Sequence, residues 1–211
     1  MKVLSGKKTT VISKCELQNR IRGFSSVNVD IGTGSGRFVL KNALNDPQRY
    51  WIGVDPVSAQ MAENAVKAQK RRMGNISFTI SSVEDLPSEL IEIADAVTVI
   101  LPWGSLRDGI AKAEPTTLNG LRLIGKPGSP LTMWIGYDEQ REAAEMARRS
   151  LPRLSETYLT GLSDAYSMAG INLQNVSSVS NTELCALESD WARRLAYGAP
   201  RQVFKMSAKM V

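Results

Sequence analysis

The sequence predicts an open α/β fold built on seven mostly parallel strands. A glycine-rich loop, Gly32-Thr33-Gly34-Ser35-Gly36, directly follows the short apolar run from Val27 to Ile31. Four further apolar runs alternate with helical patterns along the next hundred or so residues. The first of these four ends on an acid, Asp55. Such a pattern is typical of a sheet that binds a nucleotide-like ligand at the carboxyl ends of its strands.

We expect one domain, residues 1–211, because this length and a hydrophobic content of 43% suit a single α/β core. Residues 1–23 are expected to form an extension made of a hairpin and a helix. Alternating residues flank a turn at Ser5-Gly6-Lys7. Ser13 is placed to cap the following helix, and Glu16 completes a capping box.

Strand and helix patterns then follow one another in a regular order. The predicted strands cover 27–31, 50–54, 76–80, 96–101 and 131–135, and helices at 38–44, 58–73 and 115–124 lie between them. Beyond these we expect helices at 138–149 and 155–169, a strand at 173–179, a helix at 181–197 and a strand at 201–209. The sheet therefore has one helical insertion after strand five and another between strands six and seven.

Composition excludes several classes of chemistry. Histidine is absent, which removes histidine general bases, Ser-His or Cys-His nucleophiles and most zinc sites. Cys15 and Cys185 are isolated, so we expect buried free thiols and no metal site or disulfide framework. Residues 1–13 lack the apolar run of a signal peptide, and no later segment reaches the ~20 apolar residues of a membrane span. A cytoplasmic protein without membrane contact is expected.

The excess of basic residues is unevenly distributed. The formal net charge is +5, and two segments concentrate it without interleaved acids. One segment ends the predicted helix 58–73 and the other closes the chain; they contain Lys67, Lys70, Arg71 and Arg72, and Arg193, Arg194, Arg201, Lys205 and Lys209. Phosphate is the natural partner of such clusters, and solvated helix ends are the alternative.

The glycine loop has a specific spacing. A dinucleotide fingerprint would place its third glycine at position 37, where this chain has arginine. Asp30, Gly32, Gly34 and Gly36 instead form the D-x-G-x-G-x-G pattern that resembles S-adenosylmethionine-dependent methyltransferases of the Rossmann-like class. Asp55 follows at the position where ribose hydroxyls need an acceptor. A tight turn with no ligand is the alternative.

The end of the fourth strand is the expected meeting point of donor and substrate, where the chain reads Pro102-Trp103-Gly104-Ser105-Leu106. Enzymes that methylate the exocyclic amine of adenine carry an acid or amide before such a proline. Leu101 precedes it here and accepts no hydrogen bond. Trp103 offers a stacking face instead, or else packs in the core. Trp51 and Trp134 lie within strand patterns, so we expect both in the core.

Several segments together resemble one family, the aminoglycoside-resistance methyltransferases that modify N1 of adenine 1408 in 16S rRNA, known as the KamB and NpmA group. The segments extend over nearly the whole chain: Asp30 to Gly34, Ile52 to Pro56, Glu84 to Pro87, Pro102 to Leu106, Arg149 to Ser155 and Ser189 to Leu195. The two tryptophan motifs are far more specific than the glycine loop. Ala199 and Pro200 depart from the basic residues of a relative, and 60–75 is less lysine-rich than in some members.

The resemblance implies a class I methyltransferase fold, S-adenosyl-L-methionine as cofactor and a role for each motif. Asp30 and Gly32 would face the methionine part of the donor, Asp55 its ribose, and Val83 and Glu84 its adenine. Gly34, Pro56, Leu101 and Pro102 would complete the donor site. Trp103 and Trp191 would clamp a flipped base, and Ser189 would orient donor or base. The rRNA phosphates would contact Lys67, Lys70, Arg71, Arg149, Arg194 and Arg201.

The implied chemistry suits a chain without histidine. Adenine N1 has a free lone pair at neutral pH, so its attack on a sulfonium methyl needs alignment and no general base. The expected partner is 16S rRNA within the 30S subunit, and we expect a monomer without metal. Two alternatives remain. A tRNA (guanine-N7) methyltransferase carries a comparable loop and Pro-Trp, with an acid before them and basic residues after. A non-catalytic donor-binding RNA-binding module is the other.

Overall fold

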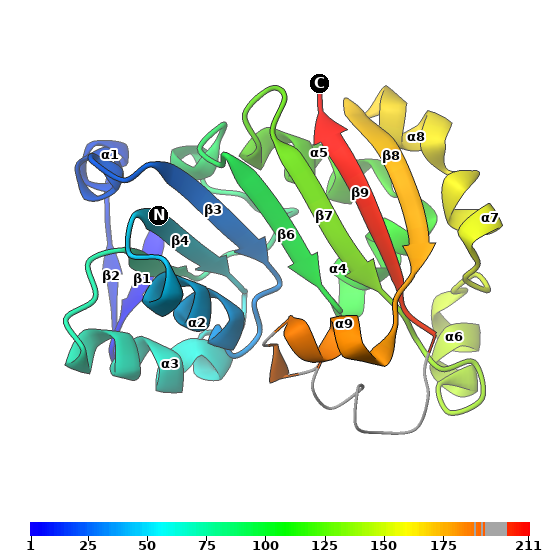
Figure 1. Cartoon of the computed structure of the whole chain (residues 1–211), viewed down its shortest axis with the longest axis horizontal. Helices are drawn as coiled ribbons and strands as arrows, with labels where there is room; N and C mark the ends of the chain where they lie inside the picture. Colours follow the sequence, from blue (N-terminus) through cyan, green and yellow to red (C-terminus); the bar gives the residue numbers. More distant parts are fainter. Residues whose placement is uncertain (188, 191, 193–201) are drawn as a thin grey trace.

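The computed structural model describes residues 1–187, 189–190, 192 and 202–211, and a single twisted sheet runs through them (Figure 1). Its strands in chain order are β1 (Lys2–Ser5), β2 (Lys8–Val11), β3 (Ser26–Ile31), β4 (Arg49–Val54), β5 (Ile76–Thr79), β6 (Ala96–Ile100), β7 (Pro130–Ile135), β8 (Ile171–Ser178) and β9 (Phe204–Met210). Within the sheet their order is β2-β1-β5-β4-β3-β6-β7-β9-β8. Strands β3 to β7 are mutually parallel, and β8 and β9 run antiparallel at one edge.

The expected α/β class with a mostly parallel sheet is confirmed, but the strand count of seven is wrong for the described residues, which contribute nine strands. The N-terminal hairpin turns at Gly6, where φ is +60°, as predicted. It is part of the sheet, because β1 pairs antiparallel with β5 through Val3 and Thr79. Val3 and Leu4 are buried there. Pairing covers the edge of β5, whose backbone groups would otherwise need solvent.

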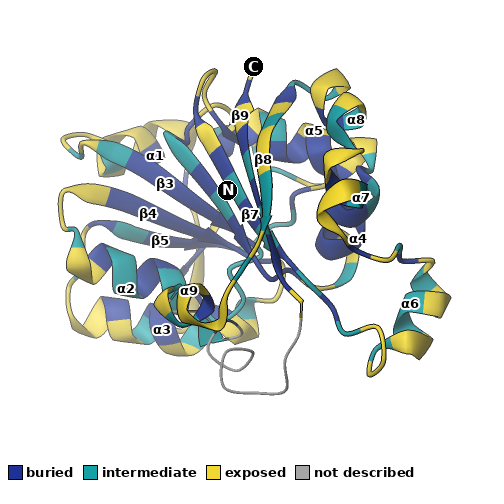
Figure 2. Cartoon of the chain, turned by 45° about the vertical axis from the view of Figure 1, so that its right-hand side comes forward, coloured by how far each residue is buried: buried dark blue, intermediate teal, exposed yellow. Residues whose placement is uncertain are grey.

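Helices cover both faces of the sheet (Figures 1 and 2). One face packs under α2 (Arg37–Asn45), α3 (Ser58–Lys70) and α9 (Asn181–Ala186). The other packs under α1 (Lys14–Ile21), α4 (Gly104–Lys112), α5 (Pro115–Ile124), α7 (Glu156–Thr160) and α8 (Ser163–Met168). A 3-10 turn spans Ser88–Leu90, and α6 (Ala143–Arg149) lies at the margin with no fully buried residue.

Several predicted helices need correction. Helix α4 was not expected, because buried Arg107 and Asp108 interrupt its apolar stripe. The stretch predicted as helix 138–149 is helical only from Ala143, and 155–169 divides into α7 and α8 around Gly161. Helix α9 ends at Ala186, and most of the remaining predicted span to 197 lies outside the described residues.

The N-terminal capping box is confirmed, whereas the predicted burial of the cysteines is wrong. Ser13 caps α1 and Glu16 completes the box. Cys15 is exposed on α1, and Cys185 is partly exposed on α9. Both thiols are free, as expected. The two short helices leave these positions near solvent, which the local sequence pattern does not reveal.

The sheet changes winding direction between two neighbouring strands, β3 and β6. From β3 the chain builds outward through β4 and β5, then returns to β6 on the other side and continues to β7. The loops that leave β3 and β6 therefore diverge at the carboxyl edge of the sheet. Ligands of open α/β sheets bind at such a switch point.

Gly120 on α5 gives a direct test of this packing. A Cβ at Gly120 would lie 2.1 Å from the backbone oxygen of Val83, whereas one at exposed Gly74 would meet nothing within 4 Å. We expect Gly120→Ala to lower the free energy of unfolding by about 1–3 kcal/mol. Gly74→Ala, the matched control, should change it by less than ~0.5 kcal/mol. Denaturant unfolding measures both, and equal midpoints would contradict the described α5 contact.

Candidate active site

The glycine loop turns directly from β3 into α2, and glycine is required along it. Gly32, Gly34 and Gly36 have φ of +69°, +56° and +72°, a region that L side chains rarely adopt. A Cβ at Gly32 would lie 2.7 Å from Leu106 Cδ2, and one at Gly36 would lie 2.3 Å from Phe78. The loop therefore holds bare backbone against the switch point.

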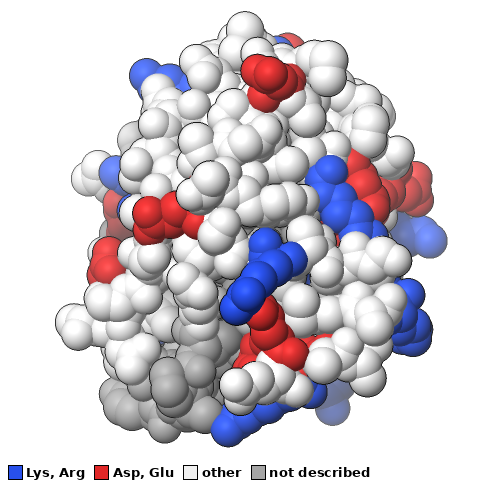
Figure 3. All heavy atoms as spheres, turned by 90° about the vertical axis from the view of Figure 1, so that its right-hand side faces the viewer, with Lys and Arg blue, Asp and Glu red and all other residues white. Residues whose placement is uncertain are grey.

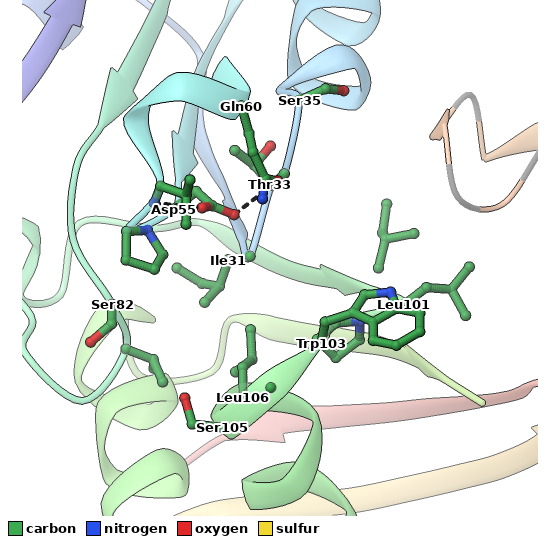
Figure 4. A pocket seen from close by; sticks show the side chains of 18 of the residues that line it. Ile31, Thr33, Ser35, Asp55, Gln60, Ser82, Leu101, Trp103, Ser105 and Leu106 are labelled. Atoms are coloured by element: carbon green, nitrogen blue, oxygen red, sulfur yellow. Dashed lines mark hydrogen bonds between the residues drawn. The ribbon is translucent and has the colours of Figure 1, made fainter. Parts of the chain in front are cut away.

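Asp55 fixes this loop to the neighbouring strand. Its Oδ2 accepts a hydrogen bond from Gly34 N at 2.9 Å, and its Oδ1 accepts one from Val57 N at 2.8 Å (Figure 4). Burial raises the pKa of the Asp55 carboxyl against the lowering effect of these two bonds. Each oxygen keeps a second lone pair. Asp55 can therefore organise the loop and still accept hydroxyl groups of a ligand.

Asp30 lies beneath the site and is only 2% exposed. Its Oδ1 accepts a hydrogen bond from Thr98 Oγ1 at 2.9 Å. Burial raises the pKa of this carboxyl to about 7, and the nearby Asp55 adds to the effect. Asp30 is not among the residues that line the pocket. It borders the site from the end of β3, and a cationic group close by would favour its ionised form.

The pocket at the switch point encloses about 550 Å³, within the ~300–1,000 Å³ typical of small-molecule sites. Figure 4 shows Asp55, Thr33 and Gln60 on one side, with Leu101, Trp103, Ser105 and Leu106 opposite. Of the predicted site residues it brings together Gly32, Gly34, Asp55, Pro56, Val83, Glu84, Leu101, Pro102, Trp103 and Ser189. Sequence reasoning did not single out Gln60 and Ser82, whose positions after β4 and β5 were the available signal.

The Leu101–Gly104 turn presents one tryptophan to this pocket. Leu101 has φ of +49°, which is costly for a branched residue, and its N–H donates to the Trp134 carbonyl. Trp103, the N-cap of α4, is 46% exposed. Its alternative assignment to the core is therefore wrong. Trp51 is buried as predicted. Trp134 is only partly buried and packs against the hydrophobic cluster that contains Ile100 and Leu101.

Asp190 links the second insertion to the glycine loop, and the sequence did not predict this contact. Its Oδ2 accepts a hydrogen bond from Ser35 Oγ at 2.6 Å, and its Oδ1 lies 3.5 Å from Arg37 Nε. The adjacent Ser189 is thereby held at the pocket wall. Trp191, the second predicted clamp residue, lies outside the described residues.

The predicted phosphate contacts are widely spaced. Lys67 pairs with Glu63 at 2.7 Å and, with Lys70 and Arg71, lies near the end of α3, roughly 10–16 Å along the helix from Gln60 at the pocket. Arg149 is engaged by Asp108 at 2.8 Å and by Glu145, so its phosphate contact stays a prediction. Arg194 and Arg201 lie outside the described residues.

The whole chain matches one protein family. Residues 2–210 fit the family model named NpmA, 16S rRNA (adenine(1408)-N(1))-methyltransferase. The chain belongs to this family. It is accordingly an S-adenosylmethionine-dependent methyltransferase, and the resemblance seen in the sequence is confirmed.

Individual relatives agree with this assignment. The chain is 34% identical to a 16S rRNA (adenine(1408)-N(1))-methyltransferase of Escherichia coli, over 98% of this chain and 97% of the relative. A mutant of the enzyme of that name from Catenulisporales acidiphilia, solved with cosubstrate SAM, is 36% identical with a TM-score of 0.88, covering 100% and 97% of the two chains. The aminoglycoside resistance methyltransferase NpmB1 is 32% identical with a TM-score of 0.86, covering 100% and 99%.

The tRNA alternative matches less of the chain. A tRNA (guanine-N(7)-)-methyltransferase of a Synechococcus strain is 30% identical over 59% of this chain and 53% of its own length. The family model, by contrast, extends from the N-terminal hairpin to β9.

The described ranges contain neither a membrane-spanning helix nor a metal-binding cluster. Among these residues, none of the helices is long and apolar enough to cross a bilayer. The same residues contain no group of three or more Cys, Asp or Glu side chains arranged to hold a metal ion.

The raised pKa of Asp30 predicts a pH-dependent stability of the donor-free protein. Unfolded Asp30 ionises near pH 3.8, whereas folded Asp30 stays protonated to about pH 7. Its contribution to the free energy of unfolding is therefore lost as pH rises through this window and stays lost above it. Asp30→Asn does not titrate, so relative to the parent it should become more stable between about pH 4 and pH 8.

Urea unfolding of both proteins at the two ends of this window measures the difference. A parent and an Asp30→Asn variant with parallel pH dependence would contradict the buried, protonated state of Asp30. Comparing the two proteins cancels the titration of the other carboxyl groups, which both share.

Proposed function

We propose that this chain transfers the methyl group of S-adenosyl-L-methionine to N1 of adenine 1408 in 16S rRNA, within the 30S decoding site, and thereby confers aminoglycoside resistance. The observation that carries the proposal is the exposed indole of Trp103 at the wall of a pocket of cofactor size. That pocket lies at the switch point of a chain that matches the family from end to end.

The described residues fit the donor. Bare glycine backbone and the hydrogen-bonded Asp55 line the pocket together with Pro56, Val83 and Glu84. Asp55 would hold the ribose hydroxyls, Val83 and Glu84 the adenine ring, and Gly32 with the underlying Asp30 the methionine part. When bound, the donor supplies an electrophilic methyl group on a positively charged sulfonium.

The chain's own contribution to catalysis is alignment. Adenine N1 carries a lone pair at neutral pH, so the residues around it need not remove a proton. Trp103, together with Trp191, would stack on the flipped base, and Ser189 would orient it. Methylation makes the base cationic, and indole faces favour a cation by ~0.5–2 kcal/mol. The stacking residues therefore stabilise the charge that develops as the bond forms.

The basic residues would recognise folded rRNA through its phosphates. Lys67, Lys70 and Arg71 lie near the C-terminal end of α3, away from Gln60 at the pocket, and would contact phosphates beside the nucleotide that enters it. Phosphates elsewhere on the rRNA surface would be contacted by Arg149, Arg194 and Arg201. We further propose that the protein acts on 30S subunits in the cytoplasm. We expect it to act as a monomer, because a large rRNA surface must be accommodated.

Methyl transfer to isolated 30S subunits with radiolabelled donor tests this function. We expect label in 16S rRNA, and reverse transcriptase stops beside adenine 1408, because N1 methylation blocks base pairing. Expression should raise resistance to kanamycin and apramycin together. Label only in tRNA, or stops at a guanine, would favour the guanine-N7 alternative. Donor binding without transfer to either RNA would favour the non-catalytic module.

Substitution of Trp103 tests the stacking role. Trp103→Ala should lose ~1–3 kcal/mol of base stacking and turn over much more slowly, and Trp103→Phe should keep part of the rate. Affinity for 30S should fall much less, since phosphate contacts supply most of the binding. Single-turnover kinetics and thermal melting measure rate and stability. A Trp103→Ala protein that melts many degrees below the parent would instead make the indole structural.

A further inference from the structure

We propose that Arg107 is a positioning residue, which holds the Trp103 indole in the orientation that stacks on the flipped base. This inference rests on the function proposed above. It concerns a side chain that neither touches the donor pocket nor belongs to the predicted phosphate contacts.

The first observation is the contact between the two side chains. The Arg107 guanidinium carbon lies over the Trp103 ring, 5.4 Å from its centroid, and 5.7 Å from the centroid of Tyr137. Trp103 is the N-cap of α4 and Arg107 follows four residues later, so both side chains lie on one face of the helix. Arg107 is 2% exposed, whereas Trp103 is 46% exposed. A buried cation thus supports a half-exposed indole.

The second observation is that Arg107 is itself fixed. Its Nε lies 3.2 Å from Asp108 Oδ1, its Nη1 lies 3.4 Å from Glu142 Oε2, and its Nη2 lies 3.9 Å from Glu145 Oε1. A buried guanidinium needs such partners, because desolvation of an unpaired charge is strongly unfavourable. Arg107 is therefore held in a single place by α4 and by the insertion that follows β7.

The network extends across the insertion. Asp108 Oδ2 also pairs with Arg149 at 2.8 Å, and Lys112 Nζ donates to the Arg149 carbonyl at 2.8 Å. Figure 3 shows basic and acidic side chains lying next to one another on this side of the molecule. The insertion thus orients Arg107, and Arg107 orients Trp103.

The planar shape of the guanidinium matters here. A flat cation can lie against an aromatic face and satisfy carboxylates at its edge, whereas a lysine ammonium offers a point charge without a plane. Removal of the plane should free the exposed indole to adopt other rotamers. The base would then meet a stacking surface that is present but misaligned, which lowers turnover more than binding.

Fluorine NMR of protein labelled with 5-fluorotryptophan tests the orientation of the indole. Comparison with Trp103→Phe assigns the Trp103 resonance. Arg107→Lys keeps the positive charge opposite the carboxylates, and Arg107→Met removes it. We expect both to shift and broaden the Trp103 resonance and to leave the Trp51 resonance in place. Arg148→Met, the matched control, removes an exposed partner of Glu145 at 2.7 Å and should leave the Trp103 resonance unmoved.

Methyl transfer supplies the second readout. Arg107→Lys should melt close to the parent and lower kcat by about 10-fold or more, with KM for 30S and donor affinity within about twofold. A folded Arg107→Lys protein with parental kcat and an unmoved Trp103 resonance would overturn the positioning role alone. A Trp103→Ala protein with parental turnover would overturn the stacking role in the proposed function, which separates the two failures.

Discussion

The pair of hydrogen bonds accepted by the Asp55 carboxylate is the interaction on which the proposed donor site depends most. This carboxylate joins the glycine loop after β3 to the first turn before α3, through one hydrogen bond from each backbone segment. Those two segments leave the neighbouring strands β3 and β4 and lead into α2 and α3, which cover the same face of the sheet. A buried acceptor shared by both therefore defines the shape of the wall and keeps further lone pairs that can accept hydrogen bonds. In the proposed function, the same side chain would serve both loop structure and ligand recognition.

Charged side chains determine the geometry of the pocket wall that contains Trp103, opposite the glycine loop. The face of the sheet under α4 is apolar, yet Arg107 and Asp108 are buried there among carboxylates from the insertion after β7. Buried ion pairs contribute little net stability, but they restrict geometry when all their partners are present. The indole of Trp103 lies at the end of this network. The insertion therefore helps to fix the geometry of the site through its ion pairs with Arg107, even though α6 lies at the margin of the fold.

Local patterns allowed much of this structure to be predicted. The parallel strands, the capping box at Ser13, the loop from Gly32 to Gly36 and the exposed Trp103 all depend on residues close together in sequence. Contacts between distant segments could not be predicted in the same way. The pairing of β1 with β5, the Ser35–Asp190 bond and the ion pairs of Arg107 with Glu142 and Glu145 join residues between 35 and 155 positions apart. The motif assigns Asp30 to the donor site, and this role stays a prediction, whereas the burial of Asp30 follows from the packing of β3 between β4 and β6.

The most direct test is the identity of the modified nucleoside. Purified 30S subunits can be incubated with this protein and S-adenosyl-L-methionine, their 16S rRNA digested to nucleosides, and the products separated and weighed by mass spectrometry. A pocket that aligns adenine N1 with the donor methyl group should give 1-methyladenosine as the new product. Appearance of N6-methyladenosine or 7-methylguanosine in its place would contradict the account, since each requires a different atom to face the donor.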